Sequence, residues 1–543
     1  MLSTVHHNMH SNMEMMDTIS YSEVKKLENE SSDEIEEPSS PSYLVSLFMG
    51  LQAIVVILLP LVKVSNSLMD VVCILPDDPV RIQVLSLMMM VTGISTLAFN
   101  IFQKRLPVLF SPSVRYYKNV SSSLSLHNAC PGSGDLFAMG FTKRSHEWKS
   151  RINTVQSGLI FTNVLTALAG LTGLCRAIDG VISNNLVLVP AGVAIGISQF
   201  EDLLKLETNT VNGSSENLDS EVIVTMTIIS LVIAALKFGE VKFRVPYYSL
   251  KEGFGARECK LFQLFSIFIS TFCVIFAYPG LQALIYGSKA YKQASGHAFP
   301  EQDDSHRFIL HRPFIYGWPK LDYEMMINLL PDVVINIATS VVIFRATRFA
   351  CGENKTLTRT VSNGVLGESL MNFILAGFGL NANVSAYNIG LGKLTGIMHT
   401  RIVKLCGLSL VLIAIHPPTL LAFSRISMYH LQAIHFLISM LVSVIGFSMI
   451  KAIRNTSSRD FAVIGSSVFT SFILPNIVLT SGCGGSSPAL LKLLSSNILI
   501  AIITAVTADK LLEGGKPVVE ENNEHHNQNN HLSFSEELFS LCI

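Results

Sequence analysis

The sequence predicts an all-α polytopic membrane protein, and composition and run length both point to it. Of its 543 residues 49% are hydrophobic and 15% are charged. A soluble protein carries roughly a quarter charged residues, so this chain has too little polar surface to cover a soluble globule. Its apolar residues also come in long runs such as 43–62 and 223–238, and a membrane-crossing helix needs about 20 such residues.

The apolar runs define the expected spans in chain order. They are 43–63, 83–102, 152–174, 180–199, 221–238, 261–285, 326–350, 364–380, 402–424, 431–451, 459–479 and 493–509. Two further segments, 105–124 and the stretch NVSAYNIGLGKLT at 383–395, are too polar and too broken for ordinary spans. Counting both predicts about 14 transmembrane segments, an even number that leaves both tails on one side.

The two broken segments occupy matching places, because each is the third of seven. An odd number of spans per half inverts the second half relative to the first. Non-helical backbone survives at membrane depth only where protein or a wet cavity satisfies it. Broken segments at matching places in inverted repeats mark the substrate site of many secondary transporters. Two kinked spans or surface loops remain the alternative.

The expected organisation follows from these spans. It has a disordered cytoplasmic tail at 1–42, a first inverted repeat of seven segments at 43–287, an extracellular loop at 288–325, a second inverted repeat at 326–510 and a disordered tail at 511–543. Lys and Arg in short loops mark the cytoplasmic side, and the loop 237–260 is rich in both. We expect both termini in the cytoplasm and location in the plasma membrane.

The cysteines leave one question open. Cys73 and Cys130 fall in loops expected on the same outer side, but no framework spacing decides whether they pair. The remaining cysteines lie mostly in apolar runs, where cysteine acts as a small hydrophobe. No metal-ligand spacing, cofactor motif or nucleophile–base pair indicates an enzyme, and the net charge of -1 indicates no nucleic-acid partner.

Several motifs in order resemble one family, the nucleobase–ascorbate transporters, also called xanthine/uracil permeases. The chain carries GLQA at 50–53, GISTL at 93–97, RLP at 105–107 and SPS at 111–113, each similar to a family motif. The most specific match is the signature Asn-x-Gly-x-x-x-x-Thr, present as Asn388, Gly390 and Thr395. The resemblance runs from about residue 43 to 511 and identifies a divergent member.

The resemblance implies a fold and a site. The family has fourteen segments in two inverted sevens, with short extended stretches followed by half-helices in the third and tenth segments. Substrate binds between their ends, where unpaired N–H groups and the positive helix dipole face the solute. By resemblance Ser113 and Val114 supply backbone contacts, and Tyr387, Asn388 and Gly390 line the tenth segment.

Three departures weaken the usual proton chemistry of the family. An ungapped alignment places Thr339, Ser340 and Ile343 at the Glu, Ser and Asp of the eighth-helix motif Glu-Ser-Ile-Gly-Asp. Tyr387 replaces the acidic residue of the signature, and Ala53 replaces the first-helix His. A threonine hydroxyl makes hydrogen bonds but cannot titrate, whereas an intramembrane carboxylate is kept for function. Proton-driven uptake by the usual Glu is therefore not expected.

Four other charged positions keep two interpretations each. Lys393 either contacts an anionic substrate such as ascorbate or urate, or snorkels to the cytosol. Arg345 is expected to reach the cytoplasmic interface rather than the substrate. Glu368 either replaces the lost carboxylate or has a structural role, and Asp332 caps the eighth helix or lines an entrance.

The sequence thus supports one main function and two alternatives. We expect a secondary transporter that moves a small heterocyclic or ascorbate-like solute by alternating access, with Na+ or H+ as the candidate coupling ions. The alternatives are a non-transporting member with a regulatory or interaction role, and an anion transporter of the same fold. The expected partners are the solute and the lipid bilayer, and the family resemblance implies a homodimer.

Overall fold

The computed structural model describes most of the apolar part of the chain. The described residues are 41–75, 78–103, 106–127, 130–131, 138–207, 243–249, 253–259, 264–269, 311–352, 358–424, 428–453, 456–481 and 488–513. The expected span 221–238, most of 261–285, most of the loop 288–325 and nearly all of both tails lie outside them. These parts of the predicted organisation therefore stay predictions.

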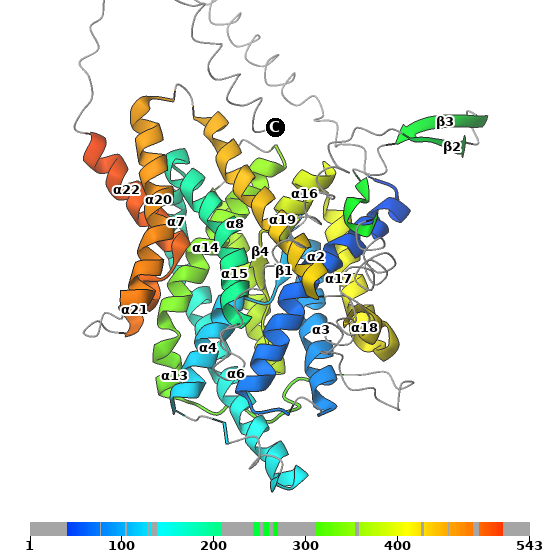
Figure 1. Ribbon diagram of the computed structural model, residues 1–543, viewed down its shortest axis with the longest axis vertical. Helices are drawn as coiled ribbons and strands as arrows, with labels where there is room; N and C mark the ends of the chain where they lie inside the picture. Colours follow the sequence, from blue (N-terminus) through cyan, green and yellow to red (C-terminus); the bar gives the residue numbers. More distant parts are fainter. Residues whose placement is uncertain are drawn as a thin grey trace, which may run out of the picture.

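The described part is predominantly helical (Figure 1). The first half contains α2 (Tyr43–Val71), α3 (Val80–Phe102), β1 (Leu109–Ser111), α4 (Val114–His127), α6 (Phe141–Thr172), α7 (Leu174–Ile182), α8 (Asn185–Glu207), β2 (Phe243–Ser249) and β3 (Gly253–Cys259). The second half contains α13 (Tyr323–Asn328), α14 (Leu330–Ala350), α15 (Thr358–Leu375), η1 (Ala376–Phe378), β4 (Asn383–Ser385), α16 (Tyr387–Thr395), α17 (Thr400–Ile415), α18 (Pro417–Ser424), α19 (Met428–Ser448), η2 (Met449–Ala452), α20 (Ser458–Ser481), α21 (Pro488–Leu494) and α22 (Asn497–Glu513).

The long helices have the length and composition of membrane spans. Within the described residues, six are long and apolar enough to cross a bilayer, or seven if the bent pair 174–182 and 185–201 forms one span. They belong to α2, α3, α6, the pair α13–α14, α19 and α20. The membrane class is supported, while the count of fourteen stays a prediction.

Two short strands from distant parts of the chain pair inside the bundle. β1 and β4 run antiparallel, with Phe110 opposite Val384, and lie near the centre of the helices (Figure 1). Each strand is followed directly by a short helix, α4 after β1 and α16 after β4. The extended stretches expected in segments 105–124 and 383–395 are thus present.

Small residues let the helices on both sides of this pair approach closely. A Cβ atom on Gly93 of α3 would lie 2.8 Å from the carbonyl oxygen of Gly407 on α17. A Cβ atom on Gly196 of α8 would lie 2.4 Å from the carbonyl oxygen of Ser439 on α19. Such contacts are typical of membrane helix pairs, which associate by packing rather than by the hydrophobic effect. The helices α3 and α17, and likewise α8 and α19, are therefore closely packed.

One end of the bundle carries a disulfide. Cys73 and Cys130 are bonded, with their Cα atoms 5.7 Å apart, which answers the question that the sequence left open. The carboxylate of Asp70 pairs with Arg81 beside it. Disulfides persist in oxidising compartments, so this end is compatible with the outer side that we expect for these loops.

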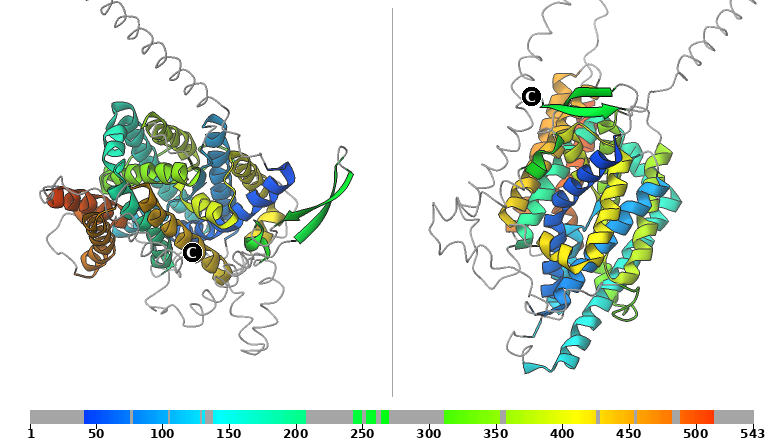
Figure 2. Two further views of the ribbon diagram at one scale, coloured as in Figure 1. Left: turned by 90° about the horizontal axis from the view of Figure 1, so that it is seen from above. Right: turned by 90° about the vertical axis from the view of Figure 1, so that its right-hand side faces the viewer.

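One expectation needs correction, and one predicted loop contains an element that the sequence did not predict. Arg345 does not reach the interface: it is 9% exposed and its Nε lies 2.5 Å from Oδ1 of the fully buried Asp179, which joins α14 to α7. The predicted cytoplasmic loop 237–260 contains the hairpin of β2 and β3, which the sequence did not predict and which stands apart from the helices (Figure 2).

Candidate functional site

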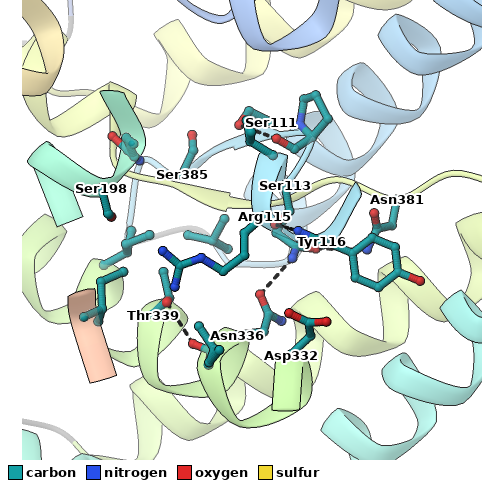
Figure 3. A pocket seen from close by; sticks show the side chains of 18 of the residues that line it. Ser111, Ser113, Arg115, Tyr116, Ser198, Asp332, Asn336, Thr339, Asn381 and Ser385 are labelled. Carbon is teal, nitrogen blue, oxygen red and sulfur yellow. Dashed lines mark hydrogen bonds between the residues drawn. The ribbon is translucent and has the colours of Figure 1, made fainter. Parts of the chain in front are cut away.

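A polar cavity of about 120 Å³ lies where the two strand–helix units meet. A cavity of this volume can hold several water molecules. Its walls come from β1–α4, α6, α8, α14, the segment from Asn381 to Tyr387, and α22. Figure 3 shows these side chains converging on one space.

The first unit is held in place by α3. The side-chain amide of Asn100 brackets Val108, with Oδ1 accepting its N–H at 3.0 Å and Nδ2 donating to its carbonyl oxygen at 2.6 Å. Oγ1 of Thr96, one turn earlier, accepts the N–H of Phe110 at 3.2 Å. These bonds satisfy backbone groups that a short strand inside an apolar bundle would otherwise leave unpaired.

The second unit is held in the same way by α15. Oδ1 of Asn372 accepts the N–H of Ala382 at 3.4 Å, and Oε1 of Glu368, one turn earlier, accepts the N–H of Val384 at 3.0 Å. Glu368 is 1% exposed. Glu368 thus supports β4 and is not among the residues that line the cavity.

One face of α14 forms the opposite wall. Asp332, Asn336, Thr339 and Ile343 all line the cavity, and their spacing of four, three and four residues places them along one stripe of a helix. Nδ2 of Asn383 donates to Oδ1 of Asn336 at 2.7 Å, which joins β4 to this helix. Thr339 donates to the carbonyl oxygen of Ile335 in its own helix.

Four of the predicted substrate-contacting residues line this cavity. Ser113 and Val114 enter from the first unit, Tyr387 from the second and Thr339 from α14. Oγ of Ser113 lies at the start of α4 and accepts the N–H of Tyr116 at 3.4 Å.

The other predicted residues lie away from the cavity lining. Ser340 and Asn388 are buried, and Nδ2 of Asn388 donates to the carbonyl oxygen of Pro107 at 2.6 Å, joining α16 to the chain before β1. A Cβ atom on Gly390 would lie 2.7 Å from the carbonyl oxygen of Ile438 on α19. Oγ1 of Thr395 accepts the N–H of Ile397 in the turn that ends α16, where Gly396 has φ +78°. Lys393 is exposed in the last turn of this helix. The signature residues therefore position α16.

The positions where the family has titratable groups are filled differently. Tyr387 is 3% exposed, and its ring centroid lies 5.1 Å from that of the buried His435 on α19. Ala53 is 1% exposed within the apolar core. Thr339 faces the cavity, as the alignment with the eighth-helix Glu expects for a residue at that place.

The structure adds residues that the sequence analysis did not single out. Arg115, Asn336, Asn381 and Asn383 all line the cavity. The signal for Asn336 was present, since it lies one turn from both Asp332 and Thr339. Arg115 follows directly after the two residues that the resemblance placed in the site. Among the described residues, no group of three or more His, Cys, Asp or Glu side chains could hold a metal ion.

A polar cavity at the ends of two strand–helix units, enclosed by apolar helices of membrane-spanning length, defines a membrane transporter. A model of the permease family matches residues 45–480. The chain belongs to this family, and the predicted resemblance is confirmed.

Individual relatives are distant. The human protein solute carrier family 23 member 2 is 23% identical over 500 residues, covering 87% of this chain and 74% of the relative. The Arabidopsis thaliana nucleobase-ascorbate transporter 3 is 22% identical over 498 residues, covering 88% of this chain and 83% of the relative. Among solved structures, the murine anion transporter Slc26a9 in its inward-facing state matches with a TM-score of 0.44 and 10% identity, covering 88% of this chain and 69% of that one.

Proposed function

We propose that this permease moves a small heterocyclic or ascorbate-like solute across the membrane by alternating access, without the usual Glu-based proton coupling. The observation that carries the proposal is the cavity between β1–α4 and β4–α16, with Ser113, Thr339 and Tyr387 in its wall. Half-helix ends that meet at a cavity in inverted repeats form the substrate sites of many secondary transporters. The names of the relatives, which include a nucleobase-ascorbate transporter, agree with this solute class.

The matching supports of the two strands favour two inverted seven-segment repeats. In both units an Asn and an acceptor one turn before it bond the strand backbone from the preceding helix. The second acceptors, Thr96 and Glu368, bond the N–H groups of Phe110 and Val384, which are opposite each other in the strand pair. The first repeat then spans 43–287 and the second 326–510, with both tails in the cytoplasm and the disulfide of Cys73 outside. Location in the plasma membrane and homodimer formation belong to the same proposal.

The absence of a carboxylate at residue 339 supports the part of the proposal that concerns coupling. A hydroxyl at this place can hydrogen-bond a ring nitrogen or carbonyl group but carries no proton between the two sides. The solute site thus lacks the group that couples it to protons in other family members, and transport is facilitative or uses Na+. Ser113, Val114, Thr339 and Tyr387 are the proposed contact residues. Ser340, Asn388, Gly390 and Thr395 are proposed to shape the site from behind its lining, and Lys393 stays a candidate anion contact outside it.

Uptake into cells that express the protein at the surface tests the proposal. Labelled uracil, xanthine, urate and ascorbate are offered with and without Na+, and uptake of at least one above that of untransfected cells is expected. No uptake of any of the four, despite surface expression, would contradict transport and favour the non-transporting alternative.

A substitution tests the role assigned to residue 339. Thr339→Glu is expected to make uptake depend on external pH, because it restores a titratable group in the wall of the cavity. Uptake that stays independent of pH in this folded variant would show that residue 339 does not occupy the coupling position.

A further inference from the structure

The wall of α14 contains an amide whose orientation is set from outside that helix. Asn336 lines the cavity and is half-buried, and Figure 3 shows it between Thr339 and Asp332 along this wall. Its Oδ1 accepts a hydrogen bond from Nδ2 of Asn383 at 2.7 Å. Its Nδ2 bonds none of the residues that the structure describes, and it is not enclosed by protein. The two N–H groups of this amide are therefore available to a solute.

A chain of hydrogen bonds decides which end of the Asn336 amide is available. The chain begins at the backbone N–H of Ala382, which can only donate, and Oδ1 of Asn372 accepts it at 3.4 Å. Asn372 then offers its Nδ2, which donates to Oδ1 of Asn383 at 3.0 Å. Because each amide has one accepting and one donating end, Asn383 offers Nδ2 to Asn336. The direction of the first bond thus passes along the chain to the cavity wall.

A third amide reinforces this direction. Nδ2 of Asn381 donates to Oδ1 of Asn383 at 3.3 Å, so that oxygen accepts from two amides. Asn372, Asn381 and Asn383 are all buried. Turning one of them over would place two donors or two acceptors against each other away from water, which is costly. The network therefore keeps the oxygen of Asn336 on Asn383 and leaves its N–H groups as the free end.

Thr339, the next residue of the stripe, has the opposite polarity. Its hydroxyl donates to the carbonyl oxygen of Ile335, so its oxygen lone pairs are what it offers to the cavity. Residues three apart are neighbours on a helix surface. The wall of α14 thus presents a donor beside an acceptor, and a solute edge with a carbonyl oxygen beside an N–H group complements both.

We propose that Asn336 is a specificity-determining contact of this cavity, held by the chain from Ala382 so that it selects solutes that present a hydrogen-bond acceptor. The inference rests on the proposed function, since it concerns the same solute site. A purely structural role, in which Asn336 only joins α14 to β4, predicts no dependence on the polarity of the solute. Two solutes of equal shape and opposite polarity separate these roles.

Xanthine and 2,6-diaminopurine provide the two polarities on one ring system. The second compound has amino groups in place of both carbonyl groups, and unprotonated ring nitrogens in place of the two N–H groups beside them. Binding of each to the purified full-length protein is measured by calorimetry at a pH where both are neutral. Xanthine is expected to bind about tenfold more tightly, because the diaminopurine leaves the donor of Asn336 unpaired. Equal or tighter binding of the diaminopurine overturns the inference, and so does binding of neither compound.

Two variants invert the polarity at this place by different routes. Asn336→Asp still accepts from Nδ2 of Asn383 but offers the cavity an acceptor in place of the donor. Asn383→Asp still accepts from Asn372 and Asn381 but no longer donates to Asn336, whose amide then turns its N–H groups toward residue 383 and its oxygen to the cavity. Both variants are expected to bind the diaminopurine more tightly than xanthine.

One control and two outcomes separate selectivity from folding. Asn476→Asp adds the same charge at an exposed position of α20 and is expected to keep the wild-type preference. Equal weakening of both compounds in folded Asn336→Asp would show a structural role only and contradict the inference. An unchanged preference in folded Asn383→Asp would contradict the control of Asn336 by the chain. If one of the two variants does not fold, the other decides by the same criterion.

Failure of this inference is distinct from failure of the proposed function. A preference for xanthine that the variants invert, without uptake of any solute, would support the inference and contradict transport. Uptake of a solute by a wild-type protein that binds both purines equally would support transport and overturn the inference.

Discussion

β1–α4 and β4–α16 lie against each other in the bundle, and each strand is held by an Asn and by a second side chain one turn earlier. In the first unit these are Asn100 and the neutral Thr96, and in the second Asn372 and the carboxylate of Glu368. The two units differ in their ionisable residue: the first places Arg115 in the cavity, and the second places Glu368 behind the strand. The two units thus share one backbone arrangement but use their ionisable residues differently. That residue lies in the cavity in the first unit and supports the strand in the second.

Replacing Asn100 or Asn372 should lower stability more than the other substitutions, and the two replacements should not lower it equally. Asn100→Leu leaves both backbone groups of Val108 without their partner. Asn372→Leu frees one backbone N–H, held at 3.4 Å, and removes one donor to Oδ1 of Asn383, which still accepts from the amide of Asn381. A buried polar group without a partner costs about 1–3 kcal/mol. The thermal unfolding midpoint of purified protein should fall more for Asn100→Leu than for Asn372→Leu.

A control exists for the change from amide to apolar side chain. Asn476 is exposed on α20 and donates within its own helix, so Asn476→Leu should change the midpoint little. Equal effects of Asn100→Leu and Asn372→Leu would contradict the difference assigned to the two supports.

The close packing of α16 against α19 should also affect stability and uptake. Gly390→Ala adds a Cβ atom 2.7 Å from the carbonyl oxygen of Ile438, and such overpacking costs about 1–3 kcal/mol. Displacement of α16 should lower both the midpoint and the uptake rate. Gly465→Ala on α20, where a Cβ atom meets nothing within 4 Å, should be neutral or slightly stabilising because alanine favours a helix. Equal effects of the two variants would refute the role assigned to Gly390.

Glu368 tests whether the second unit uses its charge or its hydrogen bond. Glu368→Gln retains an oxygen that can accept the N–H of Val384, so uptake should stay within about threefold of wild type. Glu368→Ala loses the acceptor and should destabilise by about 1–3 kcal/mol. Loss of uptake in a folded Glu368→Gln protein would assign a direct role to the charge.

Replacing Thr96 should lower stability least among these substitutions. Thr96→Val removes one acceptor, at 3.2 Å from the N–H of Phe110, and should destabilise by about 1 kcal/mol or more. Thr507→Val on α22 is the matched control, since Thr507 is exposed and bonds within its own helix. If both variants unfold at the wild-type midpoint, the first strand does not depend on this support.

The sequence predicted the frame of the site better than its lining. Polar breaks at matching places predicted two non-helical segments, because backbone polar groups inside an apolar bundle need a partner. The family resemblance added the short extended stretch and half-helix in each. The contacts of Asn100 and Asn372 were not predictable, since buried amides look alike in sequence. Arg115 was missed because a basic residue in an amphipathic helix usually faces solvent. Pairing of Cys73 with Cys130 depended on loop positions that spacing alone does not define.

The central claim is that a permease with threonine at residue 339 transports its solute without a proton gradient. The most direct test is initial uptake of the best-transported solute into vesicles containing the purified protein, first with an inward proton gradient and then with the gradient collapsed. We predict rates that agree within about twofold under the two conditions. Uptake that stops when the gradient is collapsed would contradict the account.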